Sequence, residues 1–339
     1  IKLTELFYEQ VIEAIARSAE GENLKPLAED QLRIDLQKAY DDGIRSVAIA
    51  FTHGYKHTAH EQRAGEIARE IGFSQVSVSR AVSPLIKLVS RGDTTVVDAY
   101  LSPILRRYVD RVAADLEAKG KDGPRLMFMQ SNGGLTDAKI FQGKDSILSG
   151  PAGGVVGMVR TAQMAGFDKI IGFDMGGTST DVANFDGEYE RTLETVVAGV
   201  RMRAPMMHIH TVAAGGGSIL QFDGARFRVG PESAGANPGP ACYRRGGPLA
   251  VLECNVMLGK IQPEFFPSVF GPNADERLDA DVVRQKFEDL AEQIAASTGE
   301  EKRSPEDVAE GFDLVFDVAA VVHVVCAHEG LAAQRHDGR

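Results

Sequence analysis

The stretch Ile170-Ile171-Gly172-Phe173-Asp174-Met175-Gly176-Gly177-Thr178-Ser179-Thr180-Asp181 decides how the rest of this 339-residue sequence is interpreted. A short apolar run ends in an aspartate, two glycines and three hydroxyl residues follow, and a second aspartate opens another apolar run. This order predicts a strand, a tight turn and a second strand. The plainest interpretation is a β-hairpin with a glycine turn.

Two features of this stretch favour a phosphate-binding loop over an ordinary turn. Gly176 and Gly177 leave backbone N–H groups accessible to a phosphate oxygen, and the hydroxyls of Thr178, Ser179 and Thr180 add donors. Asp174 ends the first strand, where it would hold Mg²⁺ or orient a water molecule. Asp181 would also bind the metal ion or water, or it would fix the conformation of the turn. An ordinary turn needs neither carboxylate.

Composition limits the class of protein. The length allows about two domains, and 43% apolar with 25% charged residues is an ordinary globular mixture. The net charge of −11 argues against nucleic acid or an anionic membrane as the main partner. No apolar run is long enough to span a membrane. Cys242, Cys254 and Cys326 are widely spaced, which fits a reducing cytoplasm and neither a disulfide framework nor a zinc site.

Helical and strand-like patterns alternate before the loop, as in a layered α/β domain. The chain is expected to open in a helix with Leu6, Val11, Ile12 and Ile15 on one face. Further elements are predicted as helices over 27–40, 61–71 and 91–118, the last broken at Ser102-Pro103, and as strands over 46–51, 75–79 and 125–130.

Three further segments contain candidate functional residues. Ser131–Leu135 follows a strand, where open α/β sheets place ligands, so it would contact substrate or nucleotide or be a plain turn. His53, His57, His60 and Glu61 are either metal ligands or, as we prefer, a loop and helix cap. Pro205–Val212 alternates like a strand, which would put His208 and His210 on one face, with His210 the better catalytic candidate.

A second glycine loop follows this strand. Gly215, Gly216 and Gly217 permit close backbone approach, and Ser218 does not sit in a nucleophile elbow. The Gly- and Pro-rich segment 229–243 is expected to be a long functional loop. No Walker sequence or Gly-x-Gly-x-x-Gly occurs. Helices are predicted over 280–296 and from an N-cap at Ser304.

The small-residue helix start Ser149–Arg160, placed before the loop, resembles the hinge of the actin-like ATPase superfamily. More specifically, the chain resembles the hydantoinase A/5-oxoprolinase family, which includes ATPase subunits of acetone and acetophenone carboxylases. The phrases typical of that family stand here in the family's order, at 131–135, 150–154, 174–181, 214–219 and 238–243.

The resemblance implies an α/β fold with actin-like, ribonuclease H-like lobes, the first of them incomplete. Residues 1–92 would be the remnant of an N-terminal region and 93–339 the core, with a hinge near 150–168 and a second lobe from 170. It implies an ATP-dependent enzyme that phosphorylates the amide oxygen of a cyclic amide, such as 5-oxoproline or a hydantoin, before ring opening.

The resemblance also assigns roles to residues. Gly176, Gly177, Thr178, Ser179 and Thr180 would bind ATP phosphates, and Gly215, Gly216, Gly217 and Ser218 would line the nucleotide or substrate cleft. Asp174, Asp181 and His210 would be catalytic, with Asp174 holding Mg²⁺. A hydantoinase B-type subunit would be the partner, and homo-oligomerisation stays open. The alternatives are the ATPase subunit of a ketone carboxylase and a non-catalytic assembly piece.

The sequence departs from the family pattern in three places. Ala250–Asn255 replaces the usual Thr-Val-Thr-Asp-Ala-Asn, which allows an altered substrate or a decayed site. Family-like sequence stops after Phe312, so 313–339 suggests a frameshifted or truncated product. A second Asp-x-Gly-Gly-Thr loop is missing, which suggests an internal piece of a longer subunit that alone binds nucleotide weakly and turns over little or no ATP.

Overall fold

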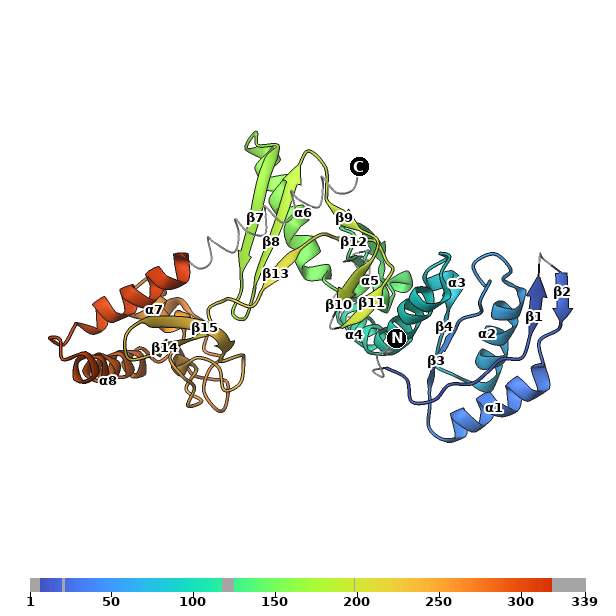
Figure 1. Cartoon of the computed structure of the whole chain (residues 1–339), viewed down its shortest axis with the longest axis horizontal. Coiled ribbons are helices and arrows are strands. Elements are labelled where there is room, and N and C mark those ends of the chain that lie inside the picture. Colours follow the sequence, from blue (N-terminus) through green and yellow to red (C-terminus); the bar gives the residue numbers. More distant parts are fainter. Residues whose placement is uncertain (1–6, 20–21, 118–124, 198, 319–339) are drawn as a thin grey trace. The chain divides into compact units, whose positions relative to one another are not determined.

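The computed structural model describes residues 7–19, 22–117, 125–197 and 199–318 (Figure 1). The chain divides into two compact units. Unit 1 consists of Ile1–Ala165 and Glu188–His208, and unit 2 consists of Gly166–Gly187 and Ile209–Arg339. The mixture of helices and strands confirms the expected α/β class.

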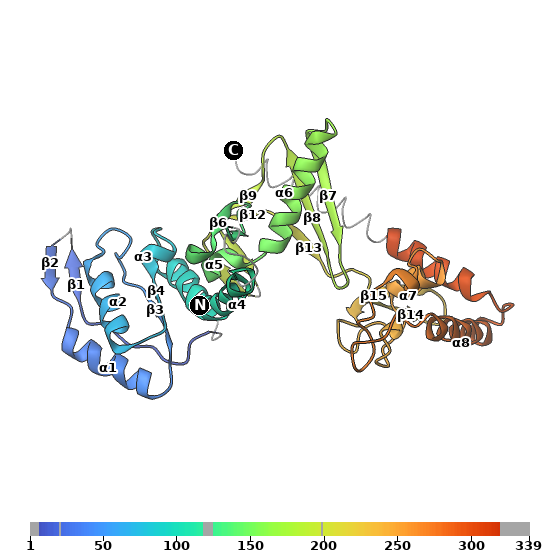
Figure 2. The same cartoon turned by 180° about the vertical axis from the view of Figure 1, so that it is seen from behind.

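The first half of unit 1 is a parallel strand pair between helices. β3 (Ser46–Ile49) and β4 (Gln75–Val78) pair in register, and they pack against α1 (Glu29–Asp41), α2 (Ala59–Ile71) and α4 (Leu88–Glu117) (Figure 2). Larger apolar side chains alternate with small or polar ones along both strands, so the two sides of the pair differ in chemistry.

The two sides of the strand pair meet different helices. Val47, Ile49 and Val76 join the apolar core made with α1 and α2. On the other side, the hydroxyl of Ser46 donates to the carbonyl oxygen of Ala99 on α4, and Ser77 is bonded to the same helix. The period-2 pattern of these short strands therefore sets the order of the layers.

The expected opening helix is wrong over the residues that the structure describes. Residues 7–16 form neither helix nor strand. Ile12, Ala14 and Ala16 pack against the core of α1 and α2, whereas Val11 and Ile15 are exposed. This spacing of two shows extended backbone, and packing of alternate residues has overridden the helical pattern. Leu6 lies outside the described residues.

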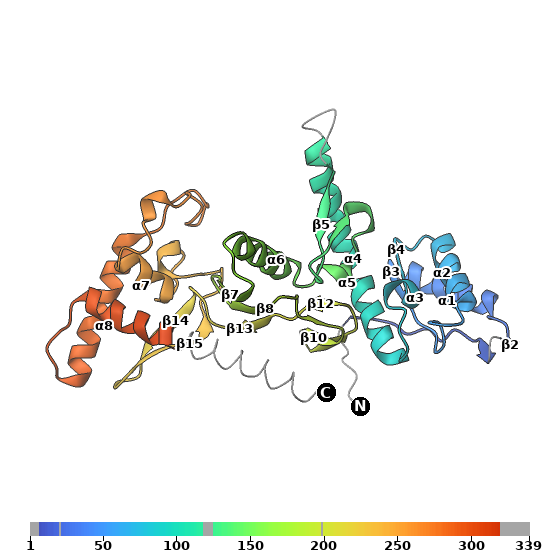
Figure 3. The ribbon, with the colours of Figure 1, turned by 90° about the horizontal axis from the view of Figure 1, so that it is seen from above.

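α4 also differs from the prediction, because it runs unbroken through Pro103 (Figure 3). The other elements of unit 1 are short strands and helical turns, together with the longer helix over residues 149–164. They are β1 (Arg17–Ala19), β2 (Glu22–Lys25), α3 (Ser79–Val82), β5 (Met127–Met129), β6 (Leu135–Asp137), η1 (Ala138–Ile140), α5 (Gly143–Ser146), α6 (Ser149–Met164), β9 (Arg191–Thr192), β10 (Thr195–Val197), β11 (Val200–Met202) and β12 (Met206–Met207).

Unit 2 begins with a three-stranded antiparallel sheet. β7 (Lys169–Met175) and β8 (Thr180–Asp186) form the predicted hairpin, and β13 (His210–Val212) pairs with the other edge of β8. Pro205–Val212 is therefore not one strand, since β12 and β13 belong to different sheets and His208 and Ile209 lie between them.

The remainder of unit 2 packs around an aromatic and aliphatic core that includes Phe287, Phe312 and Val283, all fully buried. The expected helices are present, and part of the expected long loop is strand. The elements are β14 (Ser218–Phe222), β15 (Phe227–Ser233), η2 (Ala241–Tyr243), α7 (Val251–Met257), η3 (Pro263–Phe265), α8 (Ala280–Thr298) and a helix over 305–318.

Two helices in this region begin at N-caps, of which the one at Ser304 was predicted and is confirmed. The hydroxyl of Ser304 accepts from the N–H of Asp307 at 3.1 Å, which is the N-cap expected there. Asp279 does the same for Val282 at the start of α8. Within the described residues, no helix is both long enough and apolar enough to cross a membrane.

The Phe287→Ala variant should lower the free energy of unfolding of unit 2 by about 3–5 kcal/mol, because it leaves a cavity in a closed core. Chemical denaturation of the variant measures the loss. Phe265→Ala is the matched control, since Phe265 is 79% exposed and its removal should change stability by less than about 0.5 kcal/mol. Equal effects of the two variants would contradict the assigned core.

Candidate phosphate-binding site

The hairpin register places the two predicted carboxylates side by side. Asp174 on β7 lies directly opposite Asp181 on β8, and Asp181 lies opposite Thr211 on β13. Directly paired residues share a face of a sheet, so these three side chains form one row across it. The hydroxyl of Thr211 donates to Asp181 Oδ1 at 2.7 Å. Opposed like charges repel, so this row favours a bound cation.

His210 is not part of that row. It pairs with Val182, and neighbouring positions on a strand project to opposite faces, so His210 faces away from Asp174 and Asp181. His208 belongs to unit 1, where its N–H donates to the carbonyl oxygen of Glu190. The structure does not bring the two histidines onto one strand face.

The turn between β7 and β8 leaves amide donors available. The N–H of Gly176 donates to the carbonyl oxygen of Ser179 at 2.8 Å and closes the turn. Over the residues that the structure describes, the N–H groups of Gly177, Thr178 and Ser179 have no hydrogen-bond acceptor. A Cβ atom on Gly177 would have open space around it. The turn thus has donors without acceptors, and the space beside Gly177 is open to an anion.

Thr180 has a different role from its neighbours Thr178 and Ser179. Its side chain is buried, and its hydroxyl donates to the carbonyl oxygen of Ala214 at 2.7 Å. Thr178 is exposed and Ser179 is half-buried. Thr180 therefore ties the hairpin to the second glycine loop, whereas the other two hydroxyls remain near the surface.

The second glycine loop packs directly onto the turn (Figure 1). The N–H of Gly216 donates to the carbonyl oxygen of Gly176 at 3.0 Å, and the N–H of Gly217 donates to that of Gly177 at 2.6 Å. A Cβ atom on Gly215 would lie 2.6 Å from the Gly176 oxygen and 2.9 Å from the nitrogen of Thr178. Only glycine allows this approach of two backbones.

Three further contacts fix the glycine loop, two from other segments and one within the loop. The N–H of Leu252 donates to the Gly216 carbonyl oxygen at 2.7 Å, and the N–H of Ala234 donates to that of Gly217 at 2.8 Å. The hydroxyl of Ser218 accepts from the N–H of Gly215 at 3.1 Å and is 3% exposed. Ser218 therefore shapes its own loop, and the lining of a cleft by Gly215, Gly216, Gly217 and Ser218 stays a prediction.

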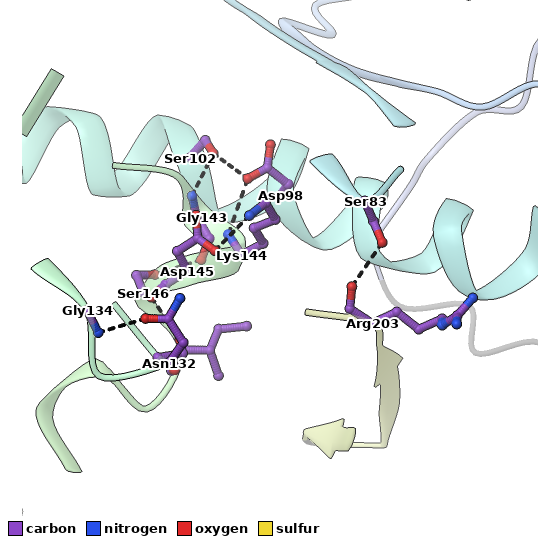
Figure 4. A network of polar contacts seen from close by, with 12 residues as sticks. Ser83, Asp98, Ser102, Asn132, Gly134, Gly143, Lys144, Asp145, Ser146 and Arg203 are labelled. Carbon is purple, nitrogen blue, oxygen red and sulfur yellow. Dashed lines mark hydrogen bonds and ion pairs between the residues drawn. The ribbon is translucent and has the colours of Figure 1, made fainter. Parts of the chain in front are cut away.

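The predicted Ser131–Leu135 loop lies in unit 1 and has its own support. Asn132 Oδ1 accepts from the N–H of Gly134 at 2.7 Å (Figure 4). The hydroxyl of Ser131 donates to the carbonyl oxygen of Asp145. Lys144 pairs with Asp145 at 2.7 Å, and both side chains are mostly buried. These contacts fix the loop conformation, and its role in ligand contact stays a prediction.

Asp98 is a buried carboxylate behind this loop that the sequence analysis missed. It accepts from the hydroxyl of Ser102 and the N–H of Lys144 (Figure 4). It also accepts from the hydroxyl of Ser77. Ser102 in turn accepts from the N–H of Gly143. The available signal was an aspartate among the buried positions of α4. The network joins β4, α4 and α5.

The histidine-rich segment before α2 is organised around Glu61, which is fully buried. Glu61 accepts from the N–H groups of Phe51 and Arg80 and from the hydroxyl of Ser79. Arg91, also buried, donates to Ser79 and to the carbonyl oxygen of Phe51. Among the described residues, no group of three His, Cys, Asp or Glu side chains could hold a metal ion.

Comparison with known proteins gives a consistent result. The hydantoinase/oxoprolinase family model matches residues 91–336, and the model for the N-terminal region of the same proteins matches residues 1–72. The expectation that family-like sequence stops after Phe312 is therefore wrong, because the match continues to residue 336. The 5-oxoprolinase of Saccharomyces cerevisiae is 45% identical over 96% of this chain and 26% of its own length. The 5-oxoprolinase 1 of Arabidopsis thaliana is 45% identical over 88% of this chain and 23% of its own length.

Two solved structures share the fold. Nucleotide-free acetone carboxylase matches with a TM-score of 0.70 and 25% identity, over 92% of this chain and 44% of its own. The ATP-dependent caprolactamase of Pseudomonas jessenii matches with a TM-score of 0.65 and 30% identity, over 91% and 44%. The chain spans about a quarter of the length of the curated relatives it matches.

The Gly215→Ala variant should destabilise unit 2 by about 1–3 kcal/mol, because its methyl group would press on backbone atoms that cannot rotate away. Gly177→Ala is the matched control, since a Cβ atom there meets nothing within 4 Å, and its stability should match the wild type. Thermal unfolding of the three proteins measures this difference. A Gly215→Ala protein as stable as the wild type would contradict the close packing of the two loops.

Proposed function

This chain belongs to the hydantoinase/oxoprolinase family, and we propose that it carries the phosphate-binding part of an ATP-dependent enzyme that opens cyclic amides of the 5-oxoproline type. The observation that carries this proposal is the glycine turn 176–179 with its free N–H donors, held by backbone contacts to Gly216 and Gly217.

The residues at the turn fit a nucleotide phosphate and its metal ion. Gly177, Thr178 and Ser179 would donate backbone N–H groups to phosphate oxygens, since no side chain covers Gly177. Asp174 would hold Mg²⁺, with Asp181 beside it. Magnesium in phosphate sites takes one or two carboxylates together with phosphate oxygens, and this row offers two.

The chemistry follows from what a cyclic amide lacks. An amide carbon is a poor electrophile, and a phosphoryl group transferred from ATP to the amide oxygen would make that carbon susceptible to attack by water. The ring C–N bond would then break, with the nitrogen leaving as the protonated amine, and a second water molecule would release phosphate and leave a carboxylate. The chain's own residues would fix the phosphates through amide donors and place the carboxylates where charge develops. His210 faces the other side of the sheet from Asp174, so we assign it no part in this step.

Two similarities favour amide over ketone substrates. The relatives at 45% identity are named 5-oxoprolinases, and a solved neighbour is an ATP-dependent caprolactamase, so both names refer to lactams. Acetone carboxylase supports the alternative, a ketone carboxylase, at a lower identity of 25%.

The finer points of organisation are part of the proposal. A relative from Pseudomonas jessenii is a caprolactamase subunit alpha, so we propose a hydantoinase B-type partner subunit or domain here. We further propose a cytoplasmic location, supported by the free thiols of Cys242 and Cys254. The two lobes would meet at a hinge near 150–168.

The Gly177→Ala variant should lower the affinity for MgADP by about tenfold or more, because the methyl group occupies the space a phosphate oxygen needs, while thermal stability stays unchanged. Isothermal titration of the chain measures the affinity. Gly157→Ala on α6 is a control, since it also adds a methyl group in open space and should bind like the wild type. Equal affinity of all three proteins would overturn the phosphate assignment.

The substrate class is tested on the full-length natural protein. ATP hydrolysis should rise on addition of 5-oxoproline and fall at least about a hundredfold in Asp174→Asn, which loses the proposed metal ligand. Stimulation by acetone with bicarbonate, and none by 5-oxoproline, would favour the carboxylase alternative. Stimulation by neither would leave a non-catalytic role.

A further inference from the structure

Glu253 is a fully buried carboxylate in the first turn of α7 and is not itself part of the phosphate turn 176–179. Its Oε1 atom accepts from the N–H of Cys242 at 2.9 Å, and its Oε2 atom accepts from the N–H of Ala250 at 2.8 Å. In the part of the chain that the structure describes, it has no ion-pair partner. Burying a carboxylate without an ion-pair partner costs free energy, so the burial of Glu253 needs a structural reason.

The contact with Ala250 compensates for a missing cap. Ala250 precedes α7 with extended backbone but has no side-chain oxygen to accept from the first turn. Glu253, three residues into the helix, reaches back to the Ala250 N–H, which is half of a capping box. The other carboxylate oxygen, Oε1, accepts from the N–H of Cys242 in η2. Glu253 therefore joins two segments of the chain.

The start of α7 is also what holds the glycine loop. The N–H of Leu252 donates to the Gly216 carbonyl oxygen at 2.7 Å, and the N–H of Gly216 donates to the Gly176 carbonyl oxygen at 3.0 Å. The N–H of Leu220, just after the loop, donates to the carbonyl oxygen of Leu249. The Glu253 carboxylate is thus connected to the phosphate turn by its hydrogen bond to Ala250, by the short backbone segment Ala250–Leu252, and by the hydrogen bonds of Leu252 and Gly216.

We propose that Glu253 is a positioning residue that holds the glycine loop 214–218 against the phosphate turn by fixing the first turn of α7. Its carboxylate is fully buried and accepts from two backbone N–H groups, so in this proposal it acts through the position of the loop. The titratable groups around it are Cys242, Tyr243, Cys254 and Asp279. This role rests on the proposed function, because the position of the glycine loop affects ligand binding only if the turn binds phosphate.

Electrostatics agree with a structural carboxyl. Burial raises the pKa of Glu253, while hydrogen bonds from Cys242 and Ala250 oppose that shift. Burial also raises the pKa of Cys242 far above its ordinary value, which makes its thiol unreactive. The pair is therefore suited to holding two backbone segments together.

The test uses three variants of the chain. Glu253→Met keeps the volume but removes both acceptors, so two buried N–H groups lose their partners. Glu253→Gln keeps one acceptor and serves as the conservative variant. Glu306→Met is the matched control, because Glu306 is an exposed residue of unit 2 paired with Arg284. Hydrogen–deuterium exchange of peptides covering 214–218 is measured without nucleotide.

Glu253→Met should speed exchange in 214–218 by about tenfold or more, beyond any change in the core helix α8, and Glu253→Gln should restore part of the protection. Glu306→Met should leave this segment unchanged. Unchanged exchange in 214–218, or an equal acceleration throughout unit 2, would overturn the positioning role. If Glu253→Met does not fold, the exchange of 214–218 relative to that of α8 is compared between Glu253→Gln and the wild type. Faster exchange confined to 214–218 supports the positioning role, and unchanged exchange overturns it.

Nucleotide binding gives the second readout. The affinity for MgADP should fall about tenfold in Glu253→Met, although the turn itself is unaltered. If the wild type binds no MgADP, the proposed function fails while exchange still decides the role of Glu253. If the wild type binds and Glu253→Met binds equally well, the link from Glu253 to the phosphate turn is wrong.

Discussion

The contact between two glycine-rich backbones is the interaction on which the site depends. Gly216 and Gly217 donate N–H groups to the carbonyl oxygens of Gly176 and Gly177, and Gly215 lies against the same turn without space for a side chain. With its carbonyl oxygens engaged, the turn is fixed without occupying its own N–H groups. A preorganised set of amide donors needs little reorganisation when an anion binds.

Other parts of unit 2 support this contact. Thr180 ties the hairpin to Ala214, Ala234 bonds the Gly217 carbonyl oxygen, and the first turn of α7 bonds that of Gly216. The carboxylate row of Asp174 and Asp181 then lies at the end of the same hairpin. Strand register places the charged groups, whereas loop packing places the amide donors, so the two properties come from separate parts of the sequence.

Elements that depend on residues close together in the sequence were predicted correctly. The hairpin, the helices α1, α2 and α8, and the Ser304 cap follow from residue patterns over a few turns. Prediction failed where distant packing decides: extended residues 7–16 and the division of 205–212 between two sheets. The roles of Thr180 and Glu253 depend on partners 34 and 11 residues away, which no single-sequence pattern reveals.

The most direct measurement is a crystal structure of the protein with an ATP analogue and Mg²⁺ bound. The account predicts phosphate oxygens within hydrogen-bond distance of the N–H groups of Gly177, Thr178 and Ser179, with the metal ion beside Asp174. Phosphates bound elsewhere, with the turn 176–179 free in solvent, would contradict it.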